Sequence, residues 1–140
     1  MNYRIITYVI GWVLNLEAIC MTLPAVTGLI YGEKTWTSFL ITGLISALAG
    51  TLLVVRRPEK PHFFMKEGCV SVALSWIALS LIGSLPFMIS GTIPHFVDAL
   101  FETVSGFTTT GASILSDVEA LSHCTLMWRS FTHWLGGMGV

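Results

Sequence analysis

The residues of this chain that could do chemistry are gathered between Phe101 and Ser113. This stretch reads FETVSGFTTTGAS, a short half-apolar segment that runs into a hydroxyl-rich, glycine-ended turn. It follows several hydrophobic segments, so we expect it at membrane depth, where lipid cannot satisfy the polar groups of the backbone. A dehydrated cation is a suitable partner for such oxygen atoms. The stretch therefore predicts a cation pathway.

The threonines and the glycine of this turn suit a selective site for potassium. Thr108, Thr109 and Thr110 can offer carbonyl and hydroxyl oxygens in one short extended run. Carbonyl dipoles replace the water around a potassium ion without adding net charge, so the ion can leave again. Gly111 permits a positive φ, and its missing Cβ leaves the axis open. These four residues are the predicted ion ligands.

A short helix is expected to position the turn. Residues 95–107 can form a helix of roughly 20 Å, which is too short to cross a bilayer, so a segment that enters and returns fits better. Its negative C-terminal end would point toward the filter, and Asp98 suits its opposite end. The competing interpretation is structural, because a threonine-rich turn that ends in glycine is often a helix C-cap.

Composition indicates an all-α membrane protein. Hydrophobic residues make up 54% of the chain and charged residues 11%, and the mean hydropathy is +0.77, whereas soluble domains carry roughly a quarter charged residues. A net charge of -1 argues against nucleic acid as a partner. The scattered cysteines and histidines form neither a CxxC nor an HExxH motif, so neither a bound cofactor nor an enzyme activity is expected.

Three apolar segments precede the turn, and a fourth membrane helix is expected to begin in residues 131–140. Spans of roughly 19 to 27 residues can cross a hydrocarbon core of about 30 Å. We expect a kink at Pro24 in the first span. Basic residues gather before the first span and between the second and third, which places the N-terminus in the cytoplasm. The spans are residues 5–31, 37–55 and 68–89, and the basic residues are Arg4, Arg56, Arg57, Lys60 and Lys66.

Several runs at fixed spacing carry a resemblance to a known family. They are DALFE at residues 98–102, SGFTTTGAS at 105–113, WRS at 128–130 and HWLGGMGV at 133–140. Together they resemble the first pore repeat of TrkH-type potassium uptake proteins, of the Trk/Ktr/HKT superfamily. The resemblance implies a leading pair of transmembrane helices in residues 1–60. Residues 61–140 would then be an M1, pore helix, filter and M2 repeat with an incomplete M2, one of four around a fourfold pseudosymmetric pore.

The resemblance also implies a function. It implies uptake of potassium, as the transported ion, across the bacterial cytoplasmic (inner) membrane. Thr109 and Thr110 would supply filter carbonyls, flanked by Thr108 and Gly111. In relatives, glycine at the Gly111 position accompanies potassium preference, and serine there relaxes it. The implied partners are a cytoplasmic nucleotide-binding ring of the TrkA type and a second copy of the full-length protein.

Three further polar residues need an interpretation. Glu102 on the short helix and Arg129 at the next membrane entry could pair behind the filter and brace it, since an unpaired charge there would cost several kcal/mol. Equally, Arg129 could extend to lipid phosphates. Glu17 lies in the middle of the first span, where a carboxyl is a functional suspect. We favour a structural hydrogen bond from Glu17 to a neighbouring helix.

We therefore predict that the chain is part of a potassium pore. The alternative is a non-conducting membrane scaffold or accessory subunit. A ring of ligands needs several copies around an axis, so the chain either oligomerises or is a fragment of a longer repeated chain. Its end within a hydrophobic segment favours the fragment. The glycines at 136, 137 and 139 predict close helix packing beside the short helix.

Overall fold

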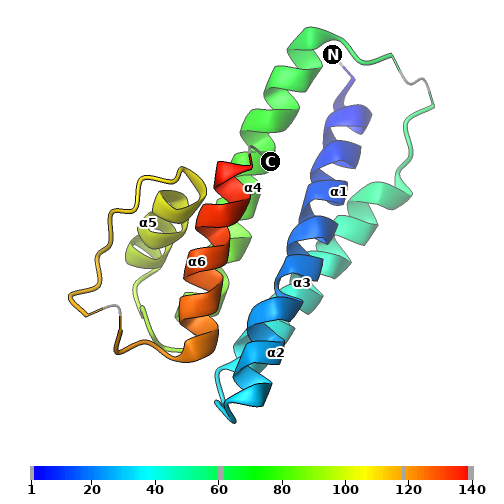
Figure 1. Cartoon of the computed structure of the whole chain (residues 1–140). Helices are drawn as coiled ribbons and strands as arrows, with labels where there is room; N and C mark the ends of the chain where they lie inside the picture. The colour runs from blue at the N-terminus through cyan, green and yellow to red at the C-terminus, as the bar shows by residue number, and fades with distance from the viewer. Residues whose placement is uncertain (1, 60–61, 118, 139–140) are drawn as a thin grey trace.

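The structure, a computed structural model, describes residues 2–59, 62–117 and 119–138. All regular elements within these ranges are α-helices, which confirms the predicted all-α class. Figure 1 shows α1 lying beside both α3 and α4, with α5 beside α4 and α6 packed between α5 and α2. The helices are α1 (Tyr3–Cys20), α2 (Thr22–Ile30), α3 (Trp36–Val55), α4 (Met65–Ile89), α5 (Phe96–Phe107) and α6 (His123–Gly137).

Three stretches in the described part of the chain are long and apolar enough to cross a membrane. They are Tyr3–Ile30, Trp36–Val55 and Met65–Ile89, with mean hydropathies of 1.7, 2.2 and 2.0. Small residues let two of these spans approach closely, because a Cβ on Gly11 would lie 2.8 Å from the carbonyl oxygen of Gly50. The chain is therefore a multi-pass membrane protein.

The helix of the first span is interrupted at Met21, between α1 and α2, one turn before Pro24. Proline has no N–H to donate to the carbonyl of Cys20, and its ring crowds that carbonyl. The disturbance consequently falls one turn before the proline, where the bond from the Ala25 N–H to the Met21 carbonyl is 3.4 Å long. The interruption lies where a proline at position 24 is expected to disturb the helix, and the kink itself stays a prediction.

The short helix α5 runs back along α4 rather than away from it. The chain turns after α4 at Gly91, whose φ is +75°, and α5 begins at Phe96 with Asp98 in its first turn, as predicted. At its other end, the Phe107 ring lies 6.0 Å from the ring of Trp76, about halfway along α4. The residues after Phe107 are thus held at the level of the middle of a membrane span.

Helix α6 begins at His123, eight residues before the apolar stretch in which a fourth helix was expected. Its first N–H groups are capped from a distant part of the chain. The carboxylate of Glu33, between α2 and α3, accepts hydrogen bonds from the backbone of His123 at 2.8 Å and of Cys124 at 3.2 Å. Burial raises the pKa of Glu33, but these bonds and the His123 ring outweigh it and hold the pKa below its ordinary value.

Two sequence predictions fall outside the described residues. The boundary between the leading pair and the repeat was placed between residues 60 and 61, and the last two residues of the glycine-rich run are Gly139 and Val140. The division into two parts therefore stays a prediction.

Candidate functional site

The predicted filter is built directly onto the C-terminus of α5. Thr108 ends the helix, and Thr109 has a φ of +57°. The N–H of Thr109 donates to the carbonyl of Gly106, and the N–H of Thr110 donates to the carbonyl of Ser105, each at 3.0 Å. This pair of bonds is the Schellman motif. The C-cap and the predicted filter are thus the same residues, so one interpretation does not exclude the other.

The expected extended run is wrong for Thr108 and Thr109. Both lie in a turn, because the carbonyls at the end of α5 draw the following N–H groups back onto the helix. In this turn Thr109 adopts a left-handed backbone conformation, which is uncommon for a β-branched residue. Such outliers cluster at functional sites, where the surrounding structure holds them.

The threonine hydroxyls are occupied within the turn. Thr108 Oγ1 donates to the carbonyl of Val104 at 2.7 Å, and Thr109 Oγ1 donates to the carbonyl of Thr108 at 2.7 Å. The hydroxyls of Thr108 and Thr110 lie 2.9 Å apart. The side chains therefore use their hydroxyl protons to fix the turn.

The backbone oxygens beyond Thr108 are free. Among the residues that the structure describes, no donor bonds to the carbonyl of Thr109, Thr110 or Gly111, and all three residues are exposed. Gly111 has a φ of +77°, a conformation in which any side chain would be strained. Three consecutive carbonyls therefore lie on a rigid turn without a protein partner, and carbonyl oxygens suit a monovalent cation.

Close backbone packing supports the turn from α6, as the glycine pattern predicted. A Cβ on Gly136 would overlap the carbonyl oxygen of Phe107 and lie 2.7 Å from its carbonyl carbon. A Cβ on Gly106 would lie 3.0 Å from the Cβ of Thr132. By contrast, a Cβ on Gly137 would lie 3.9 Å from the Thr109 side chain, an ordinary contact. Gly136 is therefore the glycine that lets α6 touch the end of α5.

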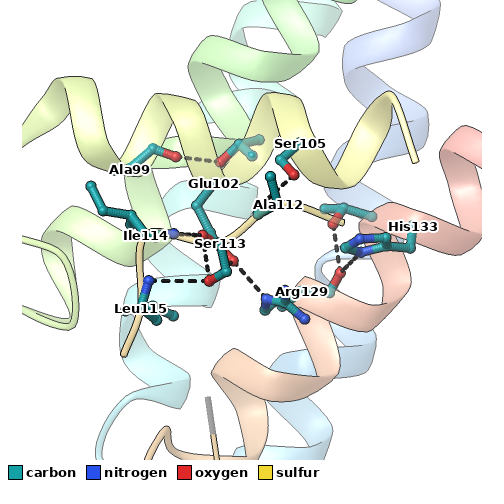
Figure 2. Close-up of polar contacts among 11 residues, drawn as sticks. Ala99, Glu102, Ser105, Ala112, Ser113, Ile114, Leu115, Arg129 and His133 are labelled. Atoms are coloured by element: carbon teal, nitrogen blue, oxygen red, sulfur yellow. Dashed lines mark hydrogen bonds and ion pairs between the residues drawn. The ribbon is translucent and has the colours of Figure 1, made fainter. Parts of the chain in front are cut away.

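Glu102 connects three segments behind the turn (Figure 2). Its carboxylate accepts from Arg129 Nε of α6 at 2.6 Å, from Ser113 Oγ at 3.1 and 3.0 Å and from the Ile114 N–H at 3.2 Å. Of the two alternatives for Arg129, the structure shows the ion pair. Only 1% of the Glu102 side chain and 18% of the Arg129 side chain are exposed. The charge pair is thus largely withdrawn from solvent.

Two serines complete the support, and sequence reasoning gave them no role. Ser105 Oγ donates to the Ala112 carbonyl at 2.5 Å, and the Ser105 carbonyl accepts the Thr110 N–H. Ser113 bonds to Glu102, as described above (Figure 2). Both serines were within the motif, and their position on either side of the threonines is the signal that could have identified them.

The hydrogen bond predicted for Glu17 is not formed. Glu17 is 1% exposed, and neither of its carboxyl oxygens has a partner among the described residues. A Cβ on Gly83 of α4 would lie 3.1 Å from Glu17 Oε1, and Phe107 and Leu135 line the same small cavity. The neighbouring helices present apolar side chains and Gly83 to this carboxyl. The polar partner that we expected for Glu17 is therefore not there.

Comparison with known proteins identifies the family of this chain. The family model described as "TrkH: Cation transport protein" matches residues 36–140. An uncharacterized cation transporter of Methanocaldococcus jannaschii is 35% identical over 96% of this chain and 28% of its own length. The Trk system potassium uptake protein TrkH of Escherichia coli K12 is 36% identical over 100% of this chain and 29% of its own.

A solved structure gives the same result in three dimensions. The crystal structure of the potassium transporter TrkH from Vibrio parahaemolyticus superposes with a TM-score of 0.92 at 33% identity, over 100% of this chain and 30% of that one. The chain thus spans less than a third of the length of these relatives. The family model covers most of the chain, and the fold agrees with it. The chain belongs to the TrkH family of cation transport proteins.

Proposed function

We propose that this chain is part of the pore-forming subunit of a Trk-type potassium uptake system and carries one of four filter segments. The observation that supports this most directly is the row of partner-free carbonyls on Thr109, Thr110 and Gly111. They lie at the negative end of α5, where the helix dipole favours a cation. The relatives named as potassium uptake proteins supply the identity of the ion.

The residues of the site divide into ligands and supports. Thr109 and Thr110 supply carbonyls to the ion, and Thr108 and Gly111 flank them. Glu102 and Arg129 brace the return of the chain after the filter, because their pair ties α6 to the segment at Ser113.

The remaining support lies at the far end of α5, away from the ion. Asp98 is in the first turn, where a carboxylate stabilises the positive end of the helix.

Residues 1–60 form the leading helix pair, and residues 61–140 form the repeat that contributes the filter.

Substitution of Gly111 tests the filter assignment. In the full-length protein, expressed in bacteria that lack potassium uptake, Gly111→Ser should relax the preference for potassium over sodium, measured as rubidium and sodium influx. Gly91→Ser is the matched control, because Gly91 also has a positive φ of +75° but lies in the turn before α5. An unchanged ion preference in Gly111→Ser contradicts the assignment. Absence of uptake by the unmodified full-length protein favours the non-conducting scaffold.

The membrane setting and the partners extend this proposal. The basic loop between α3 and α4 supports a cytoplasmic N-terminus in the bacterial inner membrane. In a cysteine-free background, an impermeant thiol reagent added outside should label Asp117→Cys and not Glu59→Cys. A TrkA-type nucleotide-binding ring and a second copy of the full-length subunit are the expected partners. Copurification and mass measurement of the detergent-solubilised complex would test both.

A further inference from the structure

We propose that the cleft between the start of α1 and the end of α3 binds the phosphate headgroup of an anionic phospholipid. The cleft has a volume of about 670 Å³ and lies at the end of the spans opposite to the α2–α3 connection (Figure 1). Its lining combines guanidinium groups with hydroxyl-bearing and apolar side chains. The lining residues are Tyr3, Arg4, Thr7, Val55, Arg56 and Arg57.

The charge of the cleft is largely uncompensated. Arg56 and Arg57 are exposed, and no acidic side chain in the described part of the chain pairs with either. Arg4 lies 3.2 Å from Glu59, but the two side chains are 63% and 85% exposed. Such a surface pair is weak and readily exchanged. Guanidinium groups bind phosphate oxygens with paired N–H donors, so these arginines suit a phosphate ligand.

The apolar surroundings point to a lipid rather than to a free phosphate. Leu44, Leu48, Leu52 and Val55 follow one another along one side of α3 and are 63%, 59%, 70% and 71% exposed. This ridge runs down the membrane span from the cleft, where an acyl chain attached to a bound headgroup would lie. Basic pockets between transmembrane helices are suited to anionic headgroups. Phosphatidylglycerol has both the charge and the chains that this surface fits.

Native mass spectrometry of the full-length protein in detergent can test the proposal. Phosphatidylglycerol should be retained in preference to phosphatidylcholine, because only the former has a net negative charge. The double variant Arg56→Gln/Arg57→Gln should bind phosphatidylglycerol about 25-fold more weakly, about fivefold for each arginine. Lys34→Gln, a charge removed at the opposite end of the spans, is the matched control and should leave binding unchanged.

A second variant is expected to strengthen lipid binding, which a folding defect would not do. Glu59→Gln frees Arg4 and should strengthen phosphatidylglycerol binding about twofold to fivefold. Inorganic phosphate at millimolar concentration should not displace the lipid, because it lacks the chains. Equal retention of the two lipids, equal losses in the double variant and Lys34→Gln, or no gain in Glu59→Gln would overturn the proposal. Full displacement by phosphate would overturn it in favour of a soluble anion.

Discussion

Neutralising either member of the Glu102–Arg129 pair should destabilise the protein unequally. Removing one partner of a buried ion pair costs about 3 to 5 kcal/mol. Arg129→Gln leaves a carboxylate that is 1% exposed with only Ser113 and the Ile114 N–H as donors, so we expect a loss of about 3 to 4 kcal/mol. Glu102→Gln leaves Arg129, which is 18% exposed and can reach water, so about 2 kcal/mol should be lost.

The double variant separates the pair from the sum of its parts. Glu102→Gln/Arg129→Gln removes both charges and leaves two neutral amides, of which the one at position 129 is shorter than arginine. Its loss of unfolding free energy should be smaller than the sum of the single losses by about 2 kcal/mol. A charge exchange, Glu102→Arg/Arg129→Glu, should rescue the single reversals only in part, because Ser113 and the Ile114 N–H would then face a cation.

The assay is SDS titration of the full-length protein in mixed micelles, combined with rubidium uptake in cells. The single variants should lose uptake in the same order as stability if the pair braces the filter. Additive single losses, or a larger effect of Glu102→Gln than of Arg129→Gln, would refute the reasoning. A pair exposed to solvent would give coupling of only about 0 to 1 kcal/mol.

Three further predictions test other parts of the structure. Gly136→Ala should lose about 1 to 3 kcal/mol of stability in the same SDS titration, because its methyl group would overlap the backbone of Phe107, whereas Gly137→Ala should be neutral. Glu17→Met should raise the unfolding free energy by about 1 kcal/mol or more, because it removes a buried carboxyl without hydrogen bonds; a decrease would indicate a missing partner. Folding lowers the pKa of Glu33 below its ordinary value of 4.5. The ionised Glu33 therefore stabilises the folded protein fully above pH 4.5, and this stabilisation is lost as the pH falls through the pKa of the folded state. Stability measured from pH 7 down to pH 3 should therefore decline more steeply in the unmodified protein than in Glu33→Gln.

Local features of this chain were predictable because they depend on neighbouring residues. The apolar spans follow from length and hydropathy, and the short helix ending at Phe107 follows from its pattern and its threonine-rich end. The need for glycine at position 111 followed from the turn, and its φ of +77° agrees. The interruption of the first span one turn before Pro24 is local for the same reason, because a proline removes the hydrogen bond to the carbonyl four residues earlier.

The errors arose where a distant residue decides the local structure. Helix α6 starts early because Glu33, 90 residues before His123, caps it, and no pattern near His123 reports this. Glu17 was expected to find a polar partner, but the helices packed against it present Gly83 and apolar side chains. The extended run at Thr108 failed because the carbonyls of α5 compete for the same N–H groups.

The sequence by itself determined that this is a helical membrane protein with several spans, since composition and span length are properties of the chain alone. Only the tertiary structure decided between the ion pair and the lipid contact for Arg129, because Glu102 and Arg129 are 27 residues apart and meet only when α5 packs on α6. It also decided that Thr109, Thr110 and Gly111 keep their carbonyls free. Hydrogen bonds are set by which groups meet in space, and a sequence read along its length does not contain that information.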